Sequence, residues 1–169
     1  MLAILEDVIP PEEFASLPRR AQVALSARCA RYVKSTPDDA ALIDAAISAT
    51  ENIASSAKLD ATSTNCANLA ERLDLAIERA TDDLGKTALL TARAALKAAM
   101  EADEPAHDMA YQAARCAMFA WRQRNDGSLE VNANRIRHDF NRIKKLAAEQ
   151  SWTDDTPVRV GIFSPLGHL

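Results

Sequence analysis

The chain has 169 residues and a formal net charge of −4; about a fifth of its residues are alanine and only 5% are aromatic. This composition excludes disordered and collagen-like chains, and three cysteines are too few for a disulfide-stapled mini-protein. No apolar run approaches the roughly 20 residues of a membrane-spanning helix, and residues 1–5 are too short for a signal-peptide core. We therefore expect one domain with its own core, reduced thiols and a cytoplasmic location.

Helical signals begin at Ser16-Leu17-Pro18, where serine can cap free amides and proline at a helix start loses no useful donor. Apolar residues at spacings of three and four then predict a helix to about residue 34, after a shorter turn around residues 11–16. The next helix is predicted over residues 37–57, because Thr36-Pro37-Asp38-Asp39 is close to a capping box with acids in its first turn.

A third helix is predicted from residues 60–63 to Leu84, with Gly85 as the left-handed residue that ends it, and a fourth over residues 86–102. The third carries two interleaved apolar rows: Cys66, Leu69, Leu73, Ile77, Ala80 and Leu84. Leu75 falls off this stripe, so we expect it to be exposed and available to a partner.

The fifth helix is predicted to begin at Asp103-Glu104-Pro105 and to end at about Arg124. A sixth follows Asp126-Gly127-Ser128, with a narrow apolar seam of Leu129, Ala133, Ile136, Phe140, Ile143 and Ala147. Connections of about 2 to 6 residues favour antiparallel neighbours. The pattern predicts an all-α, single-domain bundle of about six mostly antiparallel helices over residues 1–151.

Residues 152–169 differ from the rest of the chain. They contain Pro157, Gly161 and Pro165 and alternate with period two over residues 158–162, which predicts an extended C-terminal arm or a short edge strand rather than an independent domain. An ordered arm must dock on its own bundle or on a neighbouring subunit. Phe163 in this arm is a candidate partner contact.

Signals for catalysis, metals or cofactors are sparse, so an enzyme is disfavoured and no cofactor is expected. Glu104-Pro105-Ala106-His107 has the E-x-x-H spacing of di-iron bundles, but it occurs once, at a helix start where acids complement the helix dipole. His138 and Asp139 diverge by about 100° and cannot pair as base and orienter. Cys29 and Cys116 each follow an arginine, and we interpret both as buried inert thiols rather than activated thiolates.

Charge is unevenly distributed along the sequence. Residues 1–108 hold 11 Lys and Arg against 18 Asp and Glu, a net charge of −7, whereas residues 109–150 hold 8 against 4, a net charge of +4. On the sixth helix four residues within about 80° form one cationic strip: Arg135, His138, Arg142 and Lys145. The strip is interpreted as a solvated face with Glu130, Asp139 and Glu149 interleaved, as a site for an acidic protein, or as a nucleic-acid footprint. A sequence pI of about 5.4 weighs against nucleic acid.

Leu17-Pro18, Arg28-Cys29-Ala30-Arg31, the alanine-rich run 40–54 and Phe163-Ser164-Pro165-Leu166 follow one another along the chain. This order resembles uncharacterised alanine-rich helical proteins of planctomycete bacteria, a resemblance that implies a helical fold and no particular activity. The general helical composition of the sequence is also similar to that of bacterial immunity proteins. We expect a non-enzymatic interaction module that self-associates or binds another protein. The alternatives are a nucleic-acid or acidic-partner binder, which would use the cationic strip, and an immunity-type inhibitor.

Overall fold

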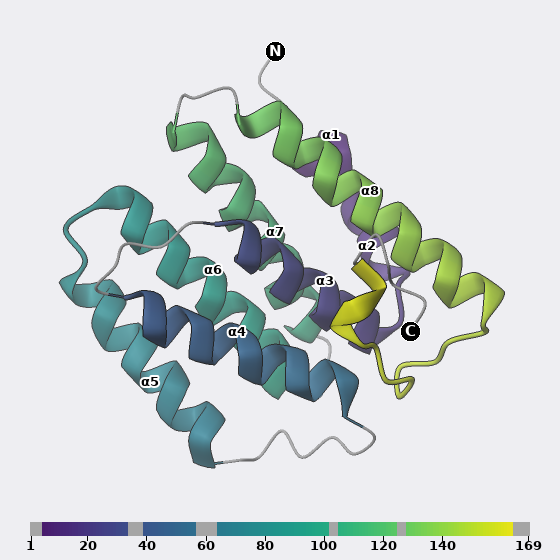
Figure 1. Ribbon diagram of the computed structural model, residues 1–169, viewed down its shortest axis with the longest axis horizontal. Helices are drawn as coiled ribbons and strands as arrows, with labels where there is room; N and C mark the ends of the chain where they lie inside the picture. Colours follow the sequence, from purple (N-terminus) through teal and green to yellow (C-terminus); the bar gives the residue numbers. More distant parts are fainter. Residues whose placement is uncertain (1–4, 34–38, 57–63, 102–104, 125–127, 164–169) are drawn as a thin grey trace.

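The computed structural model describes residues 5–33, 39–56, 64–101, 105–124 and 128–163. In these ranges the chain forms eight α-helices and one 3-10 helix, and no strand (Figure 1). The elements are α1 Leu5–Val8, α2 Pro11–Ala15, α3 Arg19–Tyr32, α4 Ala40–Ser55, α5 Thr64–Arg79, α6 Asp83–Met100, α7 Pro105–Arg124, α8 Ser128–Glu149 and η1 Val160–Phe163. The predicted all-α bundle is confirmed, and the two short helices α1 and α2 account for the count above six. No helix in the described ranges has the length and apolarity needed to cross a membrane.

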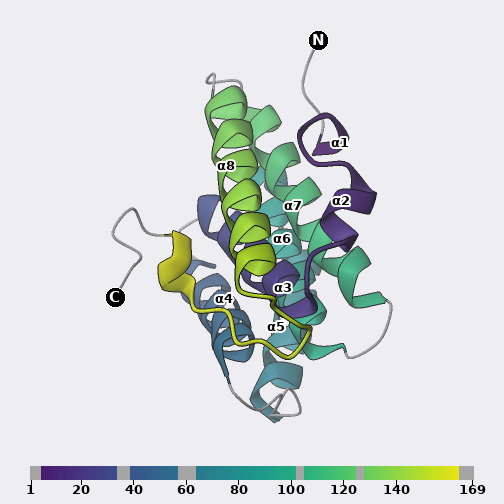
Figure 2. The same cartoon turned by 90° about the vertical axis from the view of Figure 1, so that its right-hand side faces the viewer.

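Helix α3 is the centre of the bundle and contacts α4, α6, α7 and α8 (Figures 1 and 2). Ala21, Leu25 and Cys29, an apolar stripe with a spacing of four residues, are 0% exposed, and every other residue of the run 20–27 is also buried. Small side chains between the stripe positions let neighbouring helices approach from several sides. A one-sided stripe therefore underestimated how deeply α3 is buried.

Two arginines in the first turn of α3 bind the ends of other helices. Arg20 is only 3% exposed, and its guanidinium donates to the carbonyl oxygen of Ser56, the C-cap of α4. Arg19 donates in the same way to the carbonyl oxygen of Glu101, the C-cap of α6. Cations are favourable at helix C-termini, where carbonyl groups lack helical partners. The start of α3 thus fixes the ends of both helices.

Helices α5 and α8 have the predicted phase. On α8, Ala133, Ile136, Phe140, Ile143 and Ala147 are buried, while the side chain of Leu129 lies outside the described part. On α5, Leu73 is fully buried and Leu75 is 44% exposed. Both apolar seams therefore face the core.

The boundary between α5 and α6 was predicted incorrectly. Helix α5 ends at Arg79 rather than Leu84, and Gly85 lies in the first turn of α6. Its N–H donates to Oδ2 of Asp82 at 2.6 Å, which makes Asp82 the N-cap of α6. A side-chain oxygen that accepts from a first-turn amide stabilises a helix start. This cap overrides the apolar spacing that continues through Leu84.

Helix α8 ends in a Schellman motif. The N–H of Trp152 donates to the oxygen of Ala147 at 2.9 Å, and Ser151 donates to Ala148 at 3.4 Å. Ser151 occupies the left-handed region, with φ 51°, at the position where glycine is usual. The motif turns the chain sharply away from the α8 axis.

The segment after α8 docks on its own bundle as far as residue 163 (Figure 2). Asp154 Oδ1 accepts a 2.8 Å hydrogen bond from the N–H of Arg19, and the N–H of Val158 donates to the oxygen of Ala54 at 2.8 Å. Val158 and Phe163 are buried. The predicted edge strand is wrong in the described part, because the segment meets the carbonyl end of a helix, which offers no strand edge, and then folds into η1. Residues 164–169 lie outside the described part.

Candidate protein-binding surface

The four residues of the predicted strip follow the outer face of α8 and are called the outer strip: Arg135, His138, Arg142 and Lys145. Arg135 and Lys145 are exposed, His138 is 73% exposed in its side chain, and Arg142 is half-buried. Lys145 Nζ lies 3.7 Å from Glu149 Oε1, and Arg135 Nη1 donates to Asn132 Oδ1 at 3.4 Å. Such exposed, loosely paired contacts add little stability. The outer strip therefore leaves most of its charge facing solvent.

A second pair of cations lies on the flank of α8 that faces α1 and α2. Arg137 Nη2 donates to the carbonyl oxygen of Asp7 at 2.9 Å, and Lys144 Nζ donates to Glu13 Oε2 at 2.7 Å. This flank is occupied by the chain's own N-terminal helices. The two sides of α8 thus carry the same kind of charge, but only one is covered by an acidic segment.

Asp139 lies beneath the outer strip and not on it. It is 4% exposed, and its Oδ2 accepts from Tyr32 Oη at 2.6 Å and from Arg28 Nε at 3.2 Å. The interpretation of Asp139 as a solvated acid is wrong, because residue 139 is three positions after Ile136 and four before Ile143 and so belongs to the seam. The contacts fix the rotation of α8 against α3.

His138 and Asp139 are not hydrogen-bonded to each other. His138 Nδ1 lies 3.7 Å from Asp139 Oδ1, beyond hydrogen-bond distance. This separation agrees with the divergence expected for adjacent positions of a helix.

The thiols beside the arginines lie in surroundings that disfavour the thiolate. Burial, and next the charge of Asp139, raises the pKa of Cys29 far above its usual range. Burial also raises the pKa of Cys116, although this side chain is only partly buried. A reactive thiolate needs a lowered pKa, so the interpretation of both as inert thiols agrees with their surroundings.

Phe163 is 5% exposed and belongs to the core rather than to a partner surface. Its ring centroid lies 5.6 Å from the guanidinium carbon of Arg28, which also lies 4.8 Å from the ring centroid of Tyr32. Two aromatic rings within about 6 Å of one cation form favourable cation–π contacts. Phe163 thereby holds the C-terminal segment against α3.

The structure does not bring Leu75 together with the outer strip. Leu75 is on α5, which lies on the opposite side of the molecule from α8 (Figure 1).

Val131 is an exposed apolar residue, at 54%, that the sequence reasoning missed. It is four positions before Arg135, so it extends the strip face by one helical turn. That i, i+4 spacing is the signal that could have found it.

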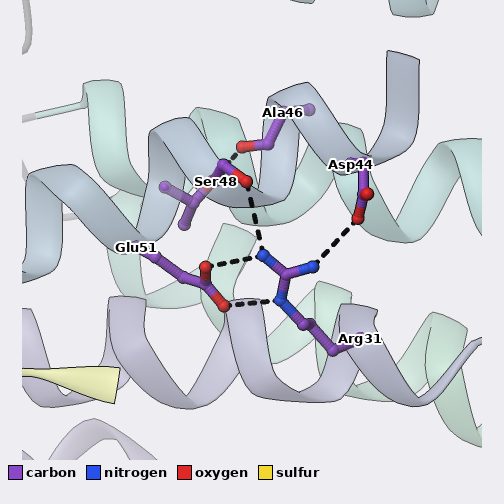
Figure 3. Close-up of polar contacts among 6 residues, drawn as sticks. Arg31, Asp44, Ala46, Ser48 and Glu51 are labelled. Atoms are coloured by element: carbon purple, nitrogen blue, oxygen red, sulfur yellow. Dashed lines mark hydrogen bonds and ion pairs between the residues drawn. The ribbon is translucent and has the colours of Figure 1, made fainter. Parts of the chain in front are cut away.

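Arg31 forms an ion cluster between α3 and α4 that sequence reasoning also missed (Figure 3). Its Nε and Nη2 each donate to a carboxylate oxygen of Glu51 at 2.7 Å, and Nη1 donates to Asp44 at 2.9 Å. Nη2 also donates to Ser48 Oγ at 3.3 Å. The hydrogen bond that Arg31 donates to Glu51 is the main cause of the raised pKa of Arg31. The cluster satisfies this guanidinium within the chain, so it is a structural contact.

The E-x-x-H motif gives no metal centre in the described residues. Glu104 lies outside them, and His107 Nε2 contacts its neighbour Asp108 Oδ1 at 3.1 Å. No group of three or more His, Cys, Asp or Glu in the described ranges could hold a metal ion.

No protein-family model, curated protein or solved structure matches this chain. The resemblance to planctomycete proteins therefore stays a prediction.

Proposed function

We propose that this protein is a helical interaction module that binds an acidic surface of another protein through the outer strip of α8. The observation that carries the proposal is the contrast between the two sides of α8. Within the chain Lys144 pairs with the carboxylate of Glu13 and Arg137 donates to the backbone oxygen of Asp7, whereas the outer strip presents Arg135, His138 and Lys145 to solvent.

The strip is held on a rigid support, which suits a binding surface. The opposite face of α8 is buried, and Asp139 ties the helix to Arg28 and Tyr32 of α3. Side chains on a preorganised element lose less entropy on binding than side chains on a loop. Val131, at the start of the same face, adds an apolar contact to the charged ones.

An acidic protein suits this surface better than nucleic acid does. The whole chain carries a formal net charge of −4, which repels a long polyanion beyond the strip. A protein partner needs only a local acidic patch, and complementary charges then speed its association and set its orientation. The strip is short enough to be matched by such a patch.

The test compares two double variants with equal charge changes. Arg135→Glu/Lys145→Glu reverses the outer strip, and Arg72→Glu/Arg79→Glu reverses two exposed arginines of α5. Binding to a labelled poly-L-glutamate that is no longer than the strip is measured by fluorescence anisotropy at low ionic strength. We expect wild type and the α5 variant to bind alike and the strip variant to bind about tenfold more weakly.

Equal affinity of all three proteins for poly-L-glutamate would contradict the proposal. A random-sequence DNA duplex is titrated in parallel. If it binds more tightly than poly-L-glutamate and only the strip variant loses that binding, the strip belongs to a nucleic-acid site instead.

A further inference from the structure

The outer strip of α8 continues at both ends into a longer line of side chains. Val131 precedes Arg135 by four residues, and Glu149 follows Lys145 by four. Both end residues are exposed. We call this line of six residues the extended strip: Val131, Arg135, His138, Arg142, Lys145 and Glu149. It has an apolar side chain at one end, the outer strip in the middle and an acid at the other end.

The spacing of the extended strip is regular. Its positions are separated by 4, 3, 4, 3 and 4 residues, which keeps them on one face of α8 along the helix. The buried seam of α8, from Ala133 to Ala147, alternates in the same way and packs on the chain's own helices. A line with this spacing fits a second helix that runs nearly along the first. Helix α8 lies on the outside of the bundle, where a further helix has room to lie along it (Figure 2).

The distances along the strip favour a helix over an extended peptide. Arg135 and Lys145 are ten residues apart, which is about 15 Å along a helix axis. A partner helix with acids at the same spacing presents its carboxylates over the same distance. An extended peptide places side chains on one side about 6.7 Å apart, so four carboxylates span about 20 Å and fall out of step with the cations.

The different ends of the extended strip give the partner a direction. Adjacent helices are favoured in antiparallel orientation, because their dipoles then oppose each other. An antiparallel partner places its positive N-terminal end beside Glu149 and its negative C-terminal end beside Arg135, and both contacts are favourable. An apolar side chain near the C-terminus of the partner would then cover Val131.

We propose that the partner of the outer strip is an acidic helix that lies antiparallel along α8 and covers Val131 with an apolar side chain near its C-terminus. This inference rests on the function proposed above and adds the shape, the direction and the apolar anchor of the partner. Charge complementarity selects the acids, the spacing selects the helix, and the apolar end of the strip selects the direction.

The experiment measures binding of three labelled synthetic peptides to the full-length protein by fluorescence anisotropy at low ionic strength. Each peptide is alanine-rich, has blocked ends and about 20 residues, enough for an isolated helix, and carries glutamates at the spacing of the strip. The first has a leucine near its C-terminus, and the second has it near its N-terminus. The third is the first with two central alanines replaced by proline, which breaks the helix without changing the charge. Circular dichroism verifies the difference in helicity.

We expect the first peptide to bind about tenfold more tightly than the third, because a preformed helix loses less entropy on binding. It should bind about threefold more tightly than the second, because only its leucine covers Val131. Val131→Ser should remove the difference between the first and second peptides and keep the difference between the first and third. Phe119→Ser is the matched control, since Phe119 is on α7 and is also 54% exposed. It should change neither difference.

Equal affinity for the first and third peptides would overturn the helical partner. Equal affinity for the first and second, or a difference between them that persists in Val131→Ser, would overturn the direction and the anchor. Arg135→Glu/Lys145→Glu separates these outcomes from failure of the proposed function. If that variant binds all three peptides more weakly than wild type does, the outer strip still binds acids and only the inference about the helix fails. If it binds all three as wild type does, the proposed function fails as well.

Discussion

Tyr32 Oη donates a 2.6 Å hydrogen bond to Asp139 Oδ2 and so joins the last turn of α3 to α8. The same carboxylate oxygen accepts from Arg28 Nε. A buried carboxylate is costly unless its charge is compensated and its oxygens are hydrogen-bonded. Here Tyr32 of the central helix supplies a hydrogen bond, and Arg28 supplies a second hydrogen bond and the compensating positive charge.

Asp139→Ala should lower the free energy of unfolding by about 1 to 3 kcal/mol, because it leaves both α3 donors without their acceptor. This loss is smaller than expected for a fully buried ion pair, because the Arg28 side chain is 28% exposed. Urea denaturation followed by circular dichroism measures it. His138→Ala, one residue away and exposed, should change the value by less than about 0.5 kcal/mol. Equal losses in the two variants would refute the role of Asp139.

Stability should fall in strongly alkaline solution. Burial, followed by the hydrogen bond to Asp139, raises the pKa of Tyr32, and burial raises the pKa of Tyr111 to about 12. Both phenols hold their protons more tightly when folded. Their contribution is therefore complete below the unfolded pKa of about 10 and is lost as the pH rises through the folded values. Urea midpoints between about pH 9 and 12 should decline less steeply for Tyr32→Phe/Tyr111→Phe than for wild type; parallel declines would contradict this origin.

Leu73 and Ile143 are fully buried in their seams. Leu73→Ala and Ile143→Ala should each cost about 2 to 5 kcal/mol, through lost apolar burial and the cavity left behind. Leu75→Ala on α5 is the control, because this side chain is 44% exposed. It should cost less than about 0.5 kcal/mol. A loss for Leu73→Ala as small as the control's would mean that α5 is rotated relative to the structure.

Ser151→Gly should stabilise the protein by about 0.5 to 1 kcal/mol. Ser151 has φ 51°, a conformation that glycine adopts without the steric cost of a Cβ atom. Gln150→Gly, one residue earlier and outside the left-handed region, should not stabilise. Thermal unfolding followed by circular dichroism separates the two, and a lower melting temperature for Ser151→Gly would contradict the Schellman assignment.

Helix phase was predictable from the sequence because an apolar seam repeats at helical spacing, as in α8. The central place of α3 was not. Arg20 and Gln22 look like solvent-facing residues locally, but Arg20 binds Ser56 and Gln22 donates from its amide to the oxygens of Ala15 and Leu17. Their burial depends on helix ends and turns whose positions no local pattern specifies.

The outer strip was predictable as a shared helix face, whereas its surroundings were not. Phe163 was expected to face a partner and instead packs on Arg28, because a three-dimensional contact decides the docking of the C-terminal segment. The charge asymmetry was visible in the sequence. The ion pair between Glu13 and Lys144, which are 131 residues apart, could be identified only from the folded structure.

The first turn of α3 receives a hydrogen-bond acceptor from the segment that follows α8. Asp154 accepts the N–H of Arg19 across 135 residues. A ribosome adds about 5 to 20 residues per second, so the central helix emerges seconds before the carboxylate that caps it. Until then water must serve as the acceptor for the N–H of Arg19.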